Sequence, residues 1–129
     1  MTGILIDTYA WMEIFCGSPW GQRALARLEN QSPQAISVLT LYELQYRLEH
    51  LYGEKKTATL LDIVVANTEV LPVDSRIAVD AGRIKAGQKR EGSSIGAVDC
   101  LILATARAYR LKILTGDRHF AGFDKTITV

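Results

Sequence analysis

Short apolar runs alternate with longer stretches of helical periodicity along the whole chain. Such runs, bounded by polar or turn residues, are typical of strands that are covered on both faces. The pattern predicts strands at residues 3–6, 35–39, 69–73, 112–114 and 126–129. The third run contains Pro72, which cannot donate a backbone hydrogen bond, and this places the strand at an edge of the sheet or ends it.

Between these runs, apolar residues recur at the three- and four-residue spacing of an amphipathic helix. The pattern predicts helices over residues 8–15, 19–28, 40–51, 54–66, 75–90 and 94–106. Ser18 followed by Pro19 is a typical helix start, and Thr40 with Glu43 has the form of a capping box. The repeated strand–helix order predicts an α/β protein, a three-layer α/β/α sandwich with a mainly parallel four- to five-stranded sheet.

One stretch, residues 94–117, organises the rest of the chain. Its helix, 94–106, is apolar almost all round and is therefore expected to be buried on most sides. Asp99 lies in the first two turns, where a carboxylate is costly unless something compensates its charge. The strand that follows leads to Asp117, so a second carboxylate lies at the carboxyl end of a strand, where sites form in open α/β sheets.

Length and composition are those of one soluble globular domain, spanning residues 1–129. Apolar residues make up 48% and charged residues 22% of the 129 positions, which is an ordinary balance. No apolar run reaches the roughly 18 residues of a membrane span, so no membrane association is expected. The N-terminus lacks the basic and long apolar segments of a secretory signal, and a cytoplasmic location is therefore expected.

The formal net charge is +1, from 15 basic and 14 acidic residues. This value neither favours nor excludes a nucleic-acid partner, because binding depends on where the charges lie. If several acids meet at one site, the remaining surface must be basic. A near-neutral chain is not expected to hold a long duplex by charge alone, which favours a local structured target such as a tRNA loop.

Four carboxylates are predicted to converge. Asp7 ends the first strand, Glu43 opens the helix after the second, and Asp117 follows the fourth. Asp99 lies early in the helix that leads into the fourth strand. Since the ends of parallel strands share one edge of a sheet, all four can face one cleft. Taken one at a time, three of these acids have structural explanations: Asp7 as a helix cap, Glu43 as a capping-box partner and Asp117 as a turn residue. No such role fits Asp99.

The conjunction of these acids favours a metal site. Carboxylates packed together repel one another and partly protonate unless cations neutralise them. Oxygen ligands without histidine or cysteine select Mg²⁺ or Mn²⁺ rather than Zn²⁺, and such a site suits the hydrolysis of phosphodiester bonds. Thr115 is expected to hold a water or a phosphate oxygen through its hydroxyl group.

The segments around the four acids resemble the acidic motifs of PIN-domain ribonucleases. They are Ile4-Leu-Ile-Asp7-Thr8, Leu39-Thr-Leu-Tyr-Glu43-Leu44, Ile95-Gly-Ala-Val-Asp99-Cys-Leu-Ile102 and Leu114-Thr-Gly-Asp117-Arg-His-Phe120. Any one motif is weak, but the four together are specific, and the resemblance covers essentially the whole chain. Their order and spacing, with the total length, are most similar to those of the VapC-type toxins of prokaryotic toxin–antitoxin pairs.

The resemblance implies a single PIN-like nuclease domain that cuts RNA. In it, Asp7, Glu43, Asp99 and Asp117 bind Mg²⁺ or Mn²⁺ and activate the attacking water. The resemblance also implies a homodimer and a cognate antitoxin that blocks the cleft.

One position departs from the family pattern. Such toxins often carry another acid two positions after the fourth, and here that position is His119. Either the fifth carboxylate is dispensable or Asp124 partly replaces it as a metal ligand. This departure from the pattern concerns whether a second metal ion is bound more than it concerns the catalytic activity.

Other interpretations fit parts of the sequence. An RNA-processing nuclease without an antitoxin would share the same residues, and the sequence separates the two poorly; a small upstream gene that overlaps this one would favour the toxin. A receiver-type signalling domain has a similar length and alternation, but it needs an acidic pair at the end of the first strand and a lysine after the last. Asp7 stands between Ile6 and Thr8, and the lysine is missing from the expected place. The receiver domain is therefore disfavoured, and the toxin nuclease is the main interpretation because the order and spacing of the motifs resemble those of VapC-type toxins.

Overall fold

The computed structural model describes residues 3–120, 123 and 126–127. In this part of the chain the strands are β1 (Ile4–Ile6), β2 (Gln34–Ser37), β3 (Glu69–Leu71), β4 (Lys112–Leu114) and β5 (Thr126–Ile127). The helices are α1 (Thr8–Cys16), α2 (Pro19–Leu28), α3 (Val38–Tyr52), α4 (Glu54–Asn67), α5 (Ser75–Arg90), α6 (Ala97–Tyr109) and the short 3₁₀ helix η1 (Arg118–Phe120). None of the described helices is both long and apolar enough to cross a membrane.

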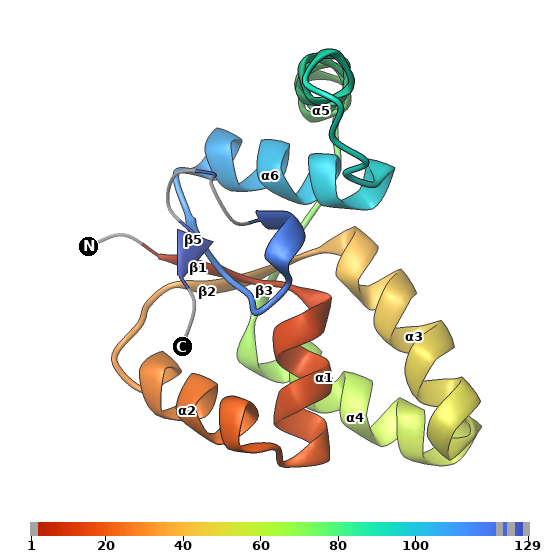
Figure 1. The fold of residues 1–129 in the computed structure, drawn as a ribbon. Coiled ribbons are helices and arrows are strands. Elements are labelled where there is room, and N and C mark those ends of the chain that lie inside the picture. Colours follow the sequence, from red (N-terminus) through yellow and green to blue (C-terminus); the bar gives the residue numbers. More distant parts are fainter. Residues whose placement is uncertain (1–2, 121–122, 124–125, 128–129) are drawn as a thin grey trace.

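The strands form one parallel sheet in the order β3-β2-β1-β4-β5 (Figure 1). All residues of β1 are buried, as expected for a central strand. β3 lies at an edge and ends at the residue before Pro72, as the proline predicted. Because the strands are parallel, the residues that follow β1, β2 and β4 emerge at the same edge of the sheet.

Helices cover both faces of the sheet. Helices α5 and α6 lie on one face, and α1 to α4 lie on the other (Figure 1). Strand residues alternate between the two cores: Leu5 packs in the same cluster as Leu103 of α6, whereas Ile4 and Ile6 pack in the cluster that contains Leu44 of α3. The predicted three-layer α/β/α sandwich is therefore confirmed.

Helix α6 has the burial that its apolar sequence predicted. It lies between the sheet and α5 (Figure 1), and its buried residues are Cys100, Ile102, Leu103, Ala104, Thr105 and Ala106. The helix begins at Ala97 and not at Ser94, because Gly96 is its N-cap. Asp99 consequently lies in the first turn, with its side chain at the strand-end edge of the sheet.

The boundary between β2 and α3 differs from the prediction. The strand ends at Ser37, whose Oγ accepts a hydrogen bond from the backbone N of Leu39 at 3.1 Å and caps the helix. Thr40 therefore lies inside the first turns of α3, and the predicted capping box is wrong. The Thr40 hydroxyl is buried and has no hydrogen-bond partner among the described residues. Glu43 is thus not used to cap its own helix.

Candidate active site

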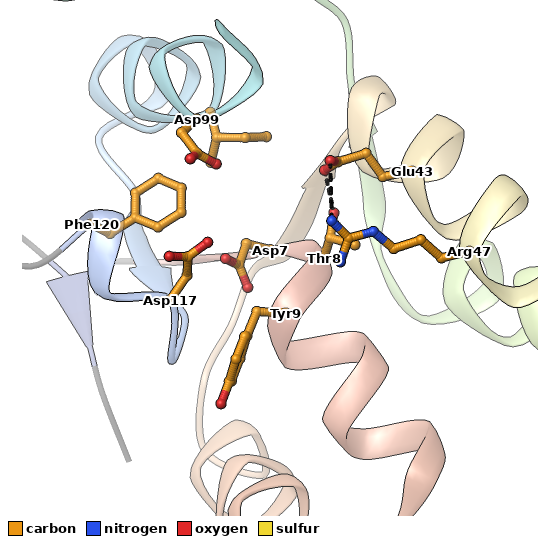
Figure 2. Close-up of a pocket in the computed structure, with 9 residues that line it drawn as sticks. Asp7, Thr8, Tyr9, Glu43, Arg47, Asp99, Asp117 and Phe120 are labelled. Atoms are coloured by element: carbon orange, nitrogen blue, oxygen red, sulfur yellow. Dashed lines mark hydrogen bonds and ion pairs between the residues drawn. The ribbon is translucent and has the colours of Figure 1, made fainter. Parts of the chain in front are cut away.

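The four predicted carboxylates line one pocket at the strand-end edge of the sheet (Figure 2). Asp7 follows β1, Asp117 follows β4, Glu43 projects from α3, and Asp99 projects from the first turn of α6. Other residues that line the pocket are Thr8, Tyr9, Arg47, Ile102 and Phe120. The fold therefore brings together four acids that are far apart in the sequence.

Asp7 is the most buried of the four acids, with 5% of its surface exposed. Its Oδ1 accepts a hydrogen bond from the backbone N of Ala10 at 2.9 Å and so caps α1. Burial raises the pKa of Asp7 from its ordinary value of 3.8 to about 7, although hydrogen bonds from Thr115 and Ala10 oppose the rise. The charges of Asp117 and Asp99 add to it. At neutral pH the charged form of Asp7 therefore needs a nearby cation.

Thr115 positions two of the acids from behind the pocket. It is 1% exposed and is not part of the pocket lining. Its Oγ1 accepts a hydrogen bond from the backbone N of Asp117 at 2.9 Å, and its hydroxyl also hydrogen-bonds to the Asp7 side chain. Thr115 therefore supports the site from behind the pocket surface, and its expected contact with a water or a phosphate oxygen stays a prediction.

A tight turn presents Asp117 to the pocket. Its Oδ1 accepts a hydrogen bond from the backbone N of His119 at 2.9 Å, which is the turn geometry that aspartate favours. The ring of Tyr9 lies where a Cβ atom on Gly116 would lie, so any larger residue at this position would displace the ring. Glycine at 116 therefore allows the turn to approach α1 closely.

Glu43 is held by a neighbouring helix. Its Oε1 accepts a hydrogen bond from the hydroxyl of Thr8, at the start of α1, at 2.7 Å (Figure 2). One turn further along α3, the guanidinium of Arg47 lies 4.0 Å from Glu43 Oε2 and also lines the pocket. The Arg47 side chain is 46% exposed, so it adds a positive charge at the rim of the pocket and does not form a buried ion pair.

Asp99 and Asp117 face the imidazole of His119. The Nδ1 atom of His119 lies 3.0 Å from Asp117 Oδ1 and 3.6 Å from Asp99 Oδ2. Burial raises the pKa of Asp99, and the charges of Asp117 and Glu43 raise it further, while His119 and Arg47 lower it. Two of the acids, Asp7 and Asp99, are therefore held under conditions that disfavour their charged forms.

Several pocket residues were not identified from the sequence. Arg47 lies four positions after Glu43, and this spacing on a helix is a signal that could have found it. Thr8 directly follows Asp7, but nothing in the sequence pairs it with Glu43. Phe120 gives no signal beyond its apolar character. Asp124, the possible additional ligand, lies outside the described residues.

Comparison with known proteins identifies the family. The family model of the PIN domain matches residues 4–126. The chain is 32% identical over 117 residues, 91% of its length and 88% of the relative's, to the tRNA(fMet)-specific endonuclease VapC of Shigella flexneri. It is 30% identical over 88 residues, 68% of its length and 67% of the relative's, to the protein of the same name from Salmonella typhimurium (strain LT2).

Solved structures agree with this match. A toxin-antitoxin complex from Klebsiella pneumoniae contains a chain with a TM-score of 0.78 and 25% identity, covering 98% of this chain and 97% of that one. DNA-bound VapBC from Salmonella typhimurium also gives a TM-score of 0.78, at 23% identity with 98% and 96% coverage, which shows the shared fold. The resemblance seen in the acidic motifs is confirmed, the receiver-type alternative is excluded, and the chain belongs to the PIN-domain family.

Proposed function

We propose that the chain is a Mg²⁺- or Mn²⁺-dependent endoribonuclease that acts as the toxin of a toxin–antitoxin pair. The observation that carries the proposal is the meeting of Asp7, Glu43, Asp99 and Asp117 in one pocket. A relative that is 32% identical over most of both chains is named a tRNA(fMet)-specific endonuclease, which supports RNA as the substrate class.

The donor set fits a divalent metal ion. The four acids offer only carboxylate oxygens, which Mg²⁺ and Mn²⁺ accept. Burial, and to a smaller extent the charges of Asp117 and Asp99, raise the pKa of Asp7 to about 7, so its charged form would be stabilised by a bound cation at neutral pH. When bound, the ion would polarise a phosphate oxygen and lower the pKa of an attacking water.

The protein's own part is to hold the acids in place. Asp7 is fixed by Ala10 and Thr115, Asp117 by Thr115 and its turn, and Glu43 by Thr8. The bonds that the three carboxylates accept come from backbone N–H groups and neutral hydroxyl groups, so they orient the carboxylates without neutralising them. The bond from the backbone N of Asp117 to Thr115 holds the main chain of the turn. Hydrogen bonds of this kind orient the ligand side chains before a metal ion binds.

Partners and location follow from the same proposal. We expect a tRNA or another structured RNA as the substrate and a cognate antitoxin that covers the cleft. We also expect the chain to be a single nuclease domain that forms a homodimer in the cytoplasm. The similarity to a chain from a toxin-antitoxin complex supports the antitoxin. Exposed apolar side chains on α3 and α4, among them Tyr42 (65% exposed), Leu51 (59%) and Val65 (50%), provide surface for such contacts.

Incubation of purified protein with total small RNA tests the nuclease. Discrete fragments should appear with Mn²⁺ or Mg²⁺ and disappear with EDTA, and sequencing of their ends would name the target. The toxin role has a separate test, because expression in bacteria should arrest growth and the Asp99→Asn variant should not. Cleavage without growth arrest would favour an RNA-processing nuclease.

Thr8→Val should weaken metal-dependent cleavage about tenfold at limiting Mn²⁺, because Glu43 loses the donor that orients it. Stability should fall by about 1 kcal/mol from the lost hydrogen bond. Thr57→Val is the matched control, since the Thr57 hydroxyl is buried on α4 and has no partner among the described residues. Steady-state cleavage at varied Mn²⁺ and urea denaturation measure the two effects. Equal activity of both variants would show that Thr8 does not position Glu43.

Arg47→Ala should raise the KM for RNA roughly three- to tenfold and leave kcat less affected. Its guanidinium lines the pocket beside Glu43, where it can contact a substrate phosphate. Loss of one phosphate contact should also lower the slope of log affinity against log salt by roughly 0.7 to 1. Arg83→Ala is the control, because Arg83 pairs with Asp80 on α5. A variant with normal KM and salt dependence would exclude this contact.

A further inference from the structure

We propose that His119 is a ligand of the metal ion and that its nitrogen makes the site favour Mn²⁺ over Mg²⁺. The inference rests on the proposed metal-dependent function and assigns a role to a residue outside the four acids. Nδ1 of His119 lies 3.0 Å from Asp117 Oδ1 and 3.6 Å from Asp99 Oδ2. The imidazole therefore already faces the two carboxylates that would share the ion.

The geometry matches one coordination sphere. One ligand atom from each of Asp99, Asp117 and His119 can be chosen so that all three lie within 4.8 Å of one another. Ligands placed about 2.1 Å from an octahedral ion lie about 3 Å apart when adjacent and about 4.2 Å apart when opposite. An ion among these atoms would thus need only small side-chain movements.

The local chain holds the imidazole near the acids. The backbone N of His119 donates to Asp117 Oδ1 at 2.9 Å, so the turn that presents the carboxylate also fixes the start of the histidine side chain. The His119 side chain is 51% exposed, which leaves it free to adjust as an ion enters. Both features suit a ligand at the open side of a pocket.

The chemistry of nitrogen gives the metal preference. Mg²⁺ strongly prefers oxygen ligands, whereas imidazole suits first-row transition ions. A histidine among the carboxylates therefore disfavours Mg²⁺ relative to Mn²⁺. The competing role for His119 is that of an imidazolium that only neutralises Asp99 and Asp117. These two roles predict opposite results when a metal ion is bound.

Pulsed electron paramagnetic resonance of Mn²⁺ in the untagged protein separates the roles. We expect a ¹⁴N coupling from a bound imidazole in the wild type, lost in His119→Asp and retained in His50→Ala. His50, on α3, is the other histidine of the chain. Calorimetric titration with each ion should show that His119→Asp lowers the preference for Mn²⁺ over Mg²⁺ at least about tenfold. Even the loss of a residue that only hydrogen-bonds to a metal ligand changes metal affinity about 10- to 100-fold.

Each outcome has one meaning. A wild-type protein that binds Mn²⁺ without ¹⁴N coupling, or an unchanged ion preference in His119→Asp, would overturn the role of His119 and leave the carboxylate site standing. A wild type that binds neither ion would overturn the proposed metal-dependent function itself. A ¹⁴N coupling that is present in the wild type and retained in His50→Ala assigns the ligand to His119, so these two proteins decide the question even if His119→Asp fails to fold.

Discussion

Replacing Asp99 with asparagine should lower RNA cleavage at least about 100-fold while the protein stays folded. Asparagine keeps the shape of the side chain and removes one of the four negative charges proposed to hold the ion. Asp99 does not cap α6, whose N-cap is Gly96, and burial already raises its pKa. The melting temperature of the metal-free variant should therefore equal or exceed that of the wild type.

Cleavage rates at saturating Mn²⁺, together with thermal melts followed by circular dichroism, measure this prediction. Asp80→Asn is the control, because Asp80 lies on α5 outside the pocket and pairs with Arg83. The control should cut RNA at the wild-type rate. An Asp99→Asn protein that cuts within threefold of the wild type would remove Asp99 from the proposed site.

Asp7→Asn should abolish cleavage and stabilise the metal-free protein above pH 7. A carboxyl pKa of about 7 in place of 3.8 means that the folded protein binds this proton more tightly than the unfolded chain does. Asp7 therefore contributes stability below pH 4 that is lost as the pH rises through 7. The full difference between the two pKa values corresponds to roughly 4 kcal/mol of unfolding free energy, which is the upper limit for the stability that Asp7→Asn gains. Asparagine can still accept the hydrogen bond from Ala10.

Urea denaturation in EDTA at pH 5 and pH 8 tests this sign. Asp7 should raise the stability of the wild type at pH 5 relative to pH 8. In Asp7→Asn this contribution is missing, so the difference in unfolding free energy between pH 5 and pH 8 should be smaller. Asp74→Asn is the matched control, since Asp74 caps α5 with a bond of the same length to Ile77 but is exposed. Equal pH dependence in the wild type and in Asp7→Asn would contradict the burial argument.

Mn²⁺ should reverse the effect in the wild type. An ion binds the deprotonated carboxylate, so at pH 8 it should raise the melting temperature of the wild type and leave Asp7→Asn almost unchanged. The residue is thus expected to destabilise the protein without metal and to stabilise it with metal. Residues kept for function commonly carry such a cost.

The strand–helix pattern was enough to predict the order of the elements and the sheet, because the apolar runs are short and alternate with helical stretches. The convergence of the acids followed from one geometric rule, that parallel strands end at the same edge. For Asp7 and Asp117, the structural and the proposed functional explanations turn out to be compatible. Asp7 caps α1 and Asp117 forms a turn, and both also line the pocket. A cap at the end of a strand is a good place from which to present a carboxylate.

Other features depend on contacts that a single sequence does not display. Ser37 and Thr40 are both good helix caps, and the apolar pair after Ser37 reads as a continuing strand, although Val38 is 42% exposed in the structure. The bond from Thr8 to Glu43 joins two helices whose relative position comes from packing on the sheet. The supporting contact of Thr115 with the backbone of Asp117 likewise depends on the turn after β4, which the sequence alone does not display.

The central claim is that the four-carboxylate pocket binds the ion on which RNA cleavage depends. The most direct test is to remove metal with EDTA, add Mn²⁺ back in steps, and measure bound Mn²⁺ and RNA cleavage in the same samples. Cleavage should be absent without metal and should rise in proportion to occupancy in the wild type, and Asp99→Asn should show neither tight binding nor cleavage. Cleavage that persists in metal-free protein, or that rises equally in Asp99→Asn, would contradict the claim.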